Sequence, residues 1–279
     1  MSERSARWRD LGVRVLSAAV MIALTLAALL AGPTVWVLYI FAIYCLMIWE
    51  LVPLCDPGVS AGGRRALASL PLMFPVVAIL MAVYSGALSD GSGWTLLDLG
   101  SFGAVIGLTA PVVAGVALLK SGRGLWLAYG AMLAAAALFL CHAYGQQGIR
   151  GLLALATIVV ISDTAGYFAG RALGGPKFWP TISPKKTWSG TVAGWIGALA
   201  FGLVALPFFG LPVVVAGLVA VALCFAAQLG DIAESAMKRR VGVKDASALI
   251  PGHGGVLDRL DGLVAAACVA GVITLVSGG

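Results

Sequence analysis

Long apolar runs, each about the length needed to cross a bilayer, follow one another along most of the chain. A membrane-spanning helix needs about 20 predominantly apolar residues. Of the 279 residues, 61% are hydrophobic and only 11% charged, against roughly 45–50% and about 25% in soluble domains. The sequence therefore predicts an all-α, polytopic integral membrane protein with about nine transmembrane helices. The expected spans are 13–31, 34–54, 67–85, 101–119, 125–143, 151–170, 190–207, 211–229 and 262–277.

The distribution of basic residues predicts the orientation, because short cytoplasmic loops retain Lys and Arg. With the N-terminus in the cytoplasm, all of the 18 Lys and Arg residues except Arg150 lie on the cytoplasmic side. A missed span would place later basic clusters on the wrong side. We therefore expect a cytoplasmic N-terminus and an outside C-terminus. The net charge of +6 is explained by these loops, and no nucleic-acid partner is expected.

Polar residues are concentrated in the second half of the chain. We expect residues 1–150 to form the N-terminal transmembrane helices and residues 151–279 to form a C-terminal catalytic region. Two cytoplasmic loops, 171–189 and 230–261, hold most of the polar groups in that region. We expect the two loops to face each other across one cytoplasmic site.

Carboxylates are frequent in the loop 230–261. Asp231 follows the eighth span, and Asp258 and Asp261 are three residues apart, so they share a face if they are helical. Hard oxygen ligands suit Mg²⁺, which commonly binds one or two carboxylates and completes its shell with water and phosphates. The alternative is a solvated face in which these carboxylates pair with Arg239, Arg240 and Arg259.

Two further segments have side chains or backbone groups suited to anions. Ser183-Pro184-Lys185-Lys186-Thr187 places two ammonium groups between hydroxyls, and Lys is a usual phosphate binder. Its alternative role is that of a positive-inside anchor or a contact to anionic lipids. In the segment 251–255, three glycines surround His253, so backbone N–H groups can face an anion. His253 itself is a candidate general acid or base, a phosphate contact or a turn residue.

Asp163 and Glu50 are ionisable residues close to the inner ends of predicted spans. Such residues are functional candidates by default, although a structural role remains open for both. Small residues spaced four apart occur on two of the spans and predict close helix packing, unless they reflect only the frequency of glycine in membrane helices. These small residues are Gly166, Gly170, Gly190, Gly194, Ala198 and Gly202.

The run 235–261 resembles, throughout its length, the C-terminal motif of the phosphatidate cytidylyltransferase family. The segments 183–187, 162–171 and 230–235 are similar to that family's other landmarks. The specific resemblance covers about residues 160–262, whereas the first five spans agree only in hydropathy. One position departs from the family pattern, because Ser189 stands where an acidic residue is usual. Any ligand or base role of that acid is therefore in doubt in this chain.

The resemblance implies the reaction of CTP with phosphatidic acid to give CDP-diacylglycerol and pyrophosphate. It also implies a homodimer in the bacterial cytoplasmic (inner) membrane, with the site facing the cytoplasm among membrane lipids, and Mg²⁺ with a second monovalent cation such as K⁺. Asp231 and Asp258 correspond to the metal ligands, with Asp261 and Asp163 as further candidates. Lys185 and Lys186 are expected to neutralise phosphate charge. The expected substrate-binding residues are Ser183, Thr187, Lys238, Arg239, Lys244, Asp245, His253, Gly254, Gly255 and Arg259.

Three alternatives differ in how well the sequence agrees with them. A transporter would have its polar groups near the membrane midplane, whereas here they gather at one face, and no inverted repeat is visible. A CDP-alcohol phosphotransferase would have an Arg shortly after Asp261-Gly262, where this chain has Leu-Val-Ala-Ala. A cytidylyltransferase for another lipid phosphate, such as an isoprenoid ether lipid, is compatible with the motif.

Overall fold

The computed structural model describes residues 3–84 and 101–277, so the predicted connection between the third and fourth spans lies outside the described residues. The chain forms two compact units. The N-terminal unit comprises residues 1–134 together with 245–259, and the C-terminal unit comprises 135–244 together with 260–279. The segment 245–259 thus belongs to the N-terminal unit although it lies far along the sequence.

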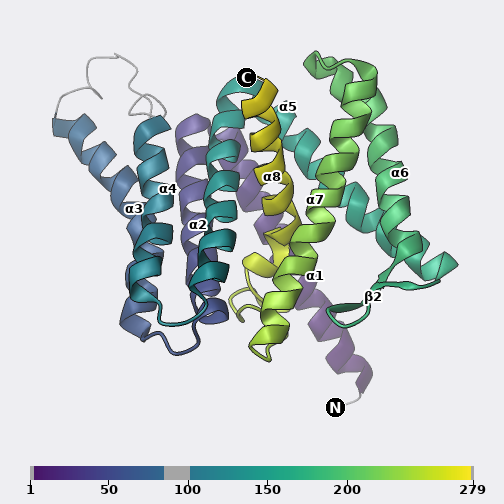
Figure 1. Ribbon diagram of the computed structural model, residues 1–279, viewed down its shortest axis with the longest axis horizontal. Coiled ribbons are helices and arrows are strands. Elements are labelled where there is room, and N and C mark those ends of the chain that lie inside the picture. Colours follow the sequence, from purple (N-terminus) through teal and green to yellow (C-terminus); the bar gives the residue numbers. More distant parts are fainter. Residues whose placement is uncertain (1–2, 85–100, 278–279) are drawn as a thin grey trace. The chain divides into compact units, whose positions relative to one another are not determined.

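The N-terminal unit is built from helices whose apolar side chains pack against one another. In Figure 1, α2, α3 and α4 lie side by side. The α2 side chains Phe41, Tyr44 and Ile48 are fully buried, and the Tyr44 hydroxyl donates to the carbonyl of Leu108 at 2.6 Å. The helices are α1 (Glu3–Leu30), α2 (Pro33–Cys55), α3 (Ala61–Tyr84), α4 (Ser101–Leu118) and the beginning of α5 (Arg123–Leu173).

Asp56 ties the end of α2 to the connection between α4 and α5. Its carboxylate accepts the backbone N–H groups of Lys120 at 2.7 Å and Ser121 at 3.1 Å. The Lys120 N–H, followed by that of Ser121, lowers the pKa of this carboxyl, because both hydrogen bonds favour the charged form. Asp56 thus fastens two connections within this unit.

The C-terminal unit combines long helices with a short hairpin. Helices α6 and α7 pack along each other. The hairpin joins α5 to α6, with Lys177 opposite Thr187 and Trp179 opposite Ser183. The elements are the remainder of α5, β1 (Lys177–Trp179), β2 (Ser183–Thr187), α6 (Trp188–Ala205), the 3₁₀ helix η1 (Leu206–Phe209), α7 (Val213–Arg240) and most of α8 (Leu257–Ser277).

The predicted close approach of helices at small residues is confirmed in this unit. A Cβ atom added at Gly190 would lie 2.5 Å from the carbonyl oxygen of Gly166, and one added at Gly202 would lie 2.4 Å from the Cβ of Ala220. Neither distance is possible without movement of the backbone or of a core side chain. These glycines are therefore packing residues, rather than a consequence of composition alone.

Among the described residues, six helices are long and apolar enough to cross a membrane. The 51-residue helix α5 is interrupted at Gly148, whose φ of 61° and ψ of −159° are not helical. Helix α1 begins at Glu3, ahead of the predicted boundary at 13, because no Gly or Pro interrupts the polar residues before Gly12. The predicted all-α class is confirmed, since the described residues are nearly all helical. The exception is the short hairpin of β1 and β2, where Pro184 is compatible with a strand but not with a helix interior.

Candidate active site

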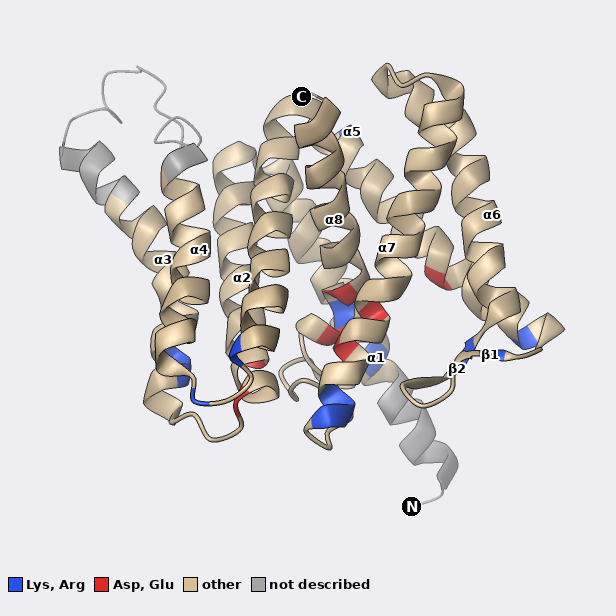
Figure 2. Ribbon diagram, viewed as in Figure 1, with Lys and Arg blue, Asp and Glu red and all other residues tan. Residues whose placement is uncertain are grey.

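In the C-terminal unit, most of the charged residues gather near one end of its helices, around the hairpin and the adjoining ends of α5, α7 and α8 (Figure 2). The hairpin brings the Ser183–Thr187 segment to this end. Lys185 is exposed and Lys186 half-buried, on successive positions of β2. Successive strand residues point to opposite faces, so the two neighbouring lysines differ in burial.

The end of the hairpin is fixed by side chains that cap α6. Thr187 is the N-cap residue of α6, and its hydroxyl accepts the N–H of Gly190 at 3.3 Å. The Ser189 hydroxyl donates to the carbonyl of Gly174 at 2.5 Å and also contacts the Thr187 hydroxyl at 3.0 Å. Ser189, at the position where the family usually has an acid, therefore links the hairpin to the start of α6. A carboxylate there would face the Gly174 carbonyl oxygen.

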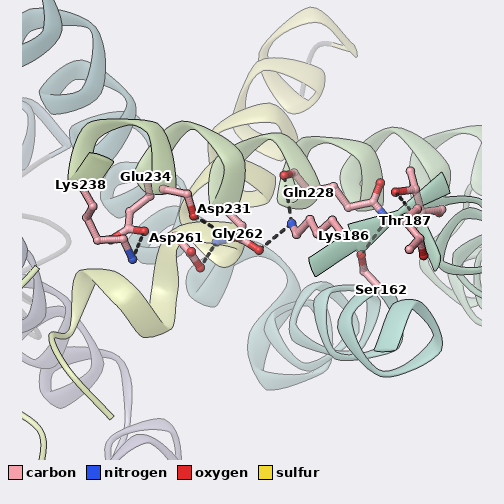
Figure 3. Close-up of polar contacts among 11 residues, drawn as sticks. Ser162, Lys186, Thr187, Gln228, Asp231, Glu234, Lys238, Asp261 and Gly262 are labelled. Atoms are coloured by element: carbon pink, nitrogen blue, oxygen red, sulfur yellow. Dashed lines mark hydrogen bonds and ion pairs between the residues drawn. The ribbon is translucent and has the colours of Figure 1, made fainter. Parts of the chain in front are cut away.

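Lys186 and Asp231 form an ion pair between β2 and α7, which Figure 3 shows at the centre of the cluster. The Lys186 Nζ lies 2.5 Å from Oδ2 of Asp231, and the two side chains are 25% and 34% exposed. The same Nζ lies 3.5 Å from the carbonyl oxygen of Gln228, and Oδ1 of Asp231 accepts from the Ser235 hydroxyl. A predicted phosphate-binding cation and a predicted metal ligand thus contact each other directly.

The side chain of Gln228 on α7 forms hydrogen bonds to residues of both α5 and α6 close to this ion pair. Its amide nitrogen donates to the Ser162 hydroxyl and to the Thr191 carbonyl, both at 3.3 Å, and its amide oxygen accepts from the Trp195 indole at 2.9 Å. The side chain is buried, and the bonds to Ser162 and Thr191 are buried with it. Gln228 thereby fixes α5 and α6 against α7 one turn before Asp231.

Two further carboxylates lie in the electrostatic field of Asp231. Asp163 interacts with Lys186 and Asp231, and Asp261 interacts with Asp231, Lys238 and Asp163. Oxygen donors of this kind fit a hard divalent cation. Within the described residues, however, no group of three or more His, Cys, Asp or Glu side chains forms a metal-binding cluster. A metal bound here would have to complete its shell with other ligands, as Mg²⁺ does with water and phosphates.

A cavity of about 490 Å³ lies among the second half of α5, the hairpin, α6 and α7. Four basic residues and one acid line it, so its wall is cationic. Gly166, Gly170 and Gly190 also line it, which leaves room for a ligand close to the backbone. The charged lining residues are Asp163, Arg171, Lys177, Lys185 and Lys186.

Farther along α7, basic side chains have partners within the protein. Lys238 Nζ lies 2.5 Å from Oε2 of Glu234, whose side chain is fully buried. Arg239 donates to the carbonyl of Val243 at 3.3 Å and so contributes to closing the end of the helix. These contacts give Lys238 and Arg239 structural roles, whereas their predicted contacts to phosphate stay predictions.

Asp258 belongs to the segment that packs in the N-terminal unit. Its Oδ2 accepts the N–H groups of Gly255 at 2.7 Å and Ala246 at 2.8 Å. The N–H of Gly254 donates to the Ile250 carbonyl at 3.1 Å. Both glycine N–H groups that we expected to face a substrate anion therefore have acceptors inside the loop.

His253 in this loop is held by α1. Its Nδ1 lies 2.8 Å from the Ser17 hydroxyl, which also contacts the carbonyl of Pro251 at 3.0 Å. A Cβ atom at Gly252, where φ is +76°, would lie 2.8 Å from Cγ of Arg14. The loop is therefore packed closely on α1, and one ring nitrogen of His253 is committed to Ser17.

Comparison with known proteins agrees with the motif. A family model described as the cytidylyltransferase family matches residues 12–276. The chain belongs to the cytidylyltransferase family. A phosphatidate cytidylyltransferase of Brucella suis is 48% identical over 172 residues, which cover 57% of this chain and 62% of that protein.

Two further relatives with the same name extend the comparison. The protein of Staphylococcus haemolyticus is 30% identical over 255 residues, 89% of this chain and 93% of its own length. That of Haemophilus influenzae is 43% identical over 126 residues, or 43% and 44% of the two chains. The chain spans less than two thirds of the Brucella suis relative in the matched region.

The two units of this cytidylyltransferase-family chain divide the predicted site residues between them. The joint binding of one metal by Asp231 and Asp258, which lie in different units, stays a prediction. The N-terminal unit contains Asp245, His253, Gly254, Gly255, Asp258 and Arg259. The C-terminal unit contains Asp163, Ser183, Lys185, Lys186, Thr187, Asp231, Lys238, Arg239, Lys244 and Asp261.

Sequence reasoning assigned no role to several residues that hold predicted site residues in place, each within its own unit. Gln228 is a lone polar residue in an apolar span, which was the available signal for it. Glu234 is a carboxylate three residues after Asp231, and its burial could not be read from the pattern. Ser17 lies in the first predicted span, far in sequence from any recognised motif.

Proposed function

We propose that the chain is a phosphatidate cytidylyltransferase, which converts CTP and phosphatidic acid into CDP-diacylglycerol and pyrophosphate. The observation that carries this proposal is the cationic cavity near Asp231. Two of its lysines, Lys185 and Lys186, come from a segment that resembles the family. The names of the Brucella, Staphylococcus and Haemophilus relatives support the same reaction.

The reaction needs two polyanions to meet. A phosphate oxygen of the lipid attacks the α-phosphorus of CTP, a new P–O bond forms, and the bond to the β-phosphate oxygen breaks to release pyrophosphate. The lipid phosphate is already anionic at neutral pH, so a strong general base is not required. Positioning and charge stabilisation supply most of the catalysis in such transfers. Lys185, Lys186 and Arg171 have the charge and the location to hold the phosphates.

Lys186 has a second role in this proposal. Without substrate, it neutralises Asp231 in a region that also contains Asp163 and Asp261. When a phosphate binds, the same ammonium group can turn from the carboxylate to the anion without leaving the cavity. This exchange would free Asp231 for a cation and couple the binding of nucleotide to the opening of the ion pair.

We propose Mg²⁺ as the cofactor, held by Asp231 and Asp258 with Asp261 and Asp163 as further candidate ligands, and K⁺ as a second cation. The donor chemistry supports this assignment, because carboxylate oxygens suit hard cations. Bound Mg²⁺ would neutralise phosphate charge at the reacting centre. The protein's own contribution is to hold Asp258 through the N–H groups of Gly255 and Ala246 and to hold Asp231 between Lys186 and Ser235.

We also propose nine membrane crossings, with the N-terminus and the active site in the cytoplasm and the C-terminus outside. An unbroken 51-residue helix would be about 75 Å long, far more than the hydrocarbon core of about 30 Å. The interruption of α5 at Gly148 therefore supports two crossings there, and α3 and α4, with 24 and 18 residues, supply the other two beyond the six clear candidates. We propose the bacterial inner membrane as the location and a homodimer as the assembly.

A direct assay tests the reaction. Purified protein in detergent is incubated with phosphatidic acid, labelled CTP and Mg²⁺, beside Asp258→Asn. We expect labelled lipid and pyrophosphate in equal amounts from the wild type and none from the variant. Product from an isoprenoid ether lipid phosphate alone would change the assigned substrate. Solute uptake by sealed vesicles without CTP consumption would instead favour a transporter.

A further inference from the structure

Glu50 is a fully buried carboxylate near the end of α2. Its Oε1 accepts from the Ser247 hydroxyl at 2.6 Å and from the N–H of Val256 at 3.0 Å. Its Oε2 accepts from the N–H of Leu257 at 2.6 Å. Both oxygens are thus engaged by the segment 245–259 of the same unit. Hydrogen bonds to an ionised acceptor are roughly twice as strong as neutral ones.

The backbone groups that Glu50 binds lie at the start of α8: Val256 directly precedes the helix, and Leu257 is its first residue. Helix N-terminal N–H groups have no partner within the helix and attract negative charge. The adjoining N–H of Gly255 instead donates to Oδ2 of Asp258, which also accepts from the N–H of Ala246. Two carboxylates therefore bind consecutive N–H groups of one turn. Glu50 accepts the N–H groups of Val256 and Leu257, and Asp258 accepts that of Gly255.

The turn leaves space for these two carboxylates only because it contains two glycines. A Cβ atom at Gly255 would lie 2.6 Å from Oε1 of Glu50, and one at Gly254 would lie 2.8 Å from Oδ2 of Asp258. Gly254 also has a φ of +84°, which side chains other than glycine rarely adopt. Each glycine of the pair thus makes room for a different carboxylate.

We propose that Glu50 is a positioning residue that fixes the turn 255–257 and, through it, the orientation of the Asp258 carboxylate. This inference rests on the proposed function insofar as Asp258 takes part in the reaction. Glu50 itself does not touch the substrate in this scheme. It is supplied by α2, outside every motif that resembles the family, and it gives the N-terminal helices a part in shaping the site.

The substitution Glu50→Gln tests this role with little change of volume. A glutamine has one amide nitrogen where the carboxylate has an oxygen, so at least one of the three donors loses its acceptor. Asp56→Asn is the matched control, because Asp56 is also a buried carboxylate at the end of α2 that accepts backbone N–H groups, but from Lys120 and Ser121. Hydrogen exchange of the purified full-length proteins in detergent gives a readout that does not depend on activity.

We expect Glu50→Gln to speed exchange of the amides at 255–258 by about tenfold, which corresponds to about 1.4 kcal/mol and lies within the range for an unsatisfied buried donor. In Asp56→Asn, exchange of these amides should stay as in the wild type while that at Lys120 and Ser121 rises. We also expect kcat for CTP to fall about tenfold in Glu50→Gln with KM changed less than about twofold, as for a group that acts on the reacting geometry.

Three results would overturn the proposal: unchanged exchange at 255–258 in Glu50→Gln, an equal increase there in Asp56→Asn, or faster exchange with unchanged kcat. If Glu50→Gln does not fold, Ser247→Ala takes its place, with an expected twofold to threefold increase at the same amides for a loss of about 0.5 kcal/mol. A folded wild type without product from any lipid phosphate would refute the proposed reaction. The exchange data would still decide whether Glu50 holds the turn of Asp258.

Discussion

Removing the charge of Lys186 should destabilise the protein more than removing the charge of its partner Asp231. The two groups are 2.5 Å apart and partly exposed. At an effective dielectric constant of about 20, unit charges about 4 Å apart attract by about 4 kcal/mol. Desolvation and screening by solvent reduce this attraction. In burial the pair is intermediate between exposed ion pairs, which contribute about 0–1 kcal/mol, and buried ion pairs, in which the loss of one partner costs about 3–5 kcal/mol. We therefore assign the pair a net contribution of about 1–2 kcal/mol.

The surrounding carboxylates make the two substitutions unequal. Lys186→Met leaves Asp231 beside Asp163 and Asp261 without its neutralising cation, so we expect the unfolding free energy to fall by about 2 kcal/mol. Asp231→Asn loses the same attraction but relieves repulsion with both carboxylates, so we expect a loss below about 1 kcal/mol.

Equilibrium unfolding in mixed micelles, with a chelator present, measures both variants and the double variant. The double variant serves as the control, because it lacks the pair altogether and should be closer in stability to Asp231→Asn than to Lys186→Met. A loss for Asp231→Asn equal to or larger than that for Lys186→Met would refute the view that Lys186 holds together a cluster of like charges.

Three other predictions concern single positions. Asp258→Asn should abolish turnover in a folded protein, since it removes a charge at almost constant volume; normal turnover in the lipid assay would refute its role. Ser189→Ala should lower the thermal midpoint through loss of about 1 kcal/mol, because Gly174 loses its hydroxyl donor; an unchanged midpoint would contradict this. Asp56 has a lowered pKa owing to the N–H of Lys120, so its stabilising effect is present above the unfolded pKa of about 3.9 and is lost as pH falls through the folded value. Unfolding measured from pH 6 to 3 should be less pH-dependent in Asp56→Asn, and identical profiles would exclude this contribution.

The sequence predicts the order and approximate location of the helices well, because hydropathy follows the bilayer rather than the details of packing. It also predicts the interruption between the fifth and sixth spans, where α5 loses helical geometry at Gly148. The hairpin at 177–187 escaped prediction because its strands have three and five residues. Strands this short have no readable period, and their pairing depends on the turn between them.

The chemistry of the candidate site was predictable by residue type but not by partner. Lys186 and Asp231 were both selected as functional, yet nothing in the pattern indicates that residues 45 positions apart pair with each other. The same holds for Gln228, whose amide reaches Ser162 and Thr191. A local motif predicts which residue types take part in the chemistry. Ion pairs and hydrogen bonds between distant segments depend instead on how whole helices pack, which a local motif does not predict.

The C-terminal motif shows most clearly that residues adjacent in sequence can have partners in distant segments. Its residues run continuously from Ser235 to Asp261, but 245–259 pack with the N-terminal helices and the remainder with the C-terminal unit. The groups that hold its loop are Ser17 on α1 and Glu50 on α2, which lie outside the motifs recognised in the sequence. Helix α2, which the sequence predicts only as a transmembrane span, therefore supplies the acceptor for the N–H groups of Val256 and Leu257 at the start of α8. Because Asp258 shares that turn, the geometry of the proposed catalytic carboxylate depends on two helices that contain no recognised motif.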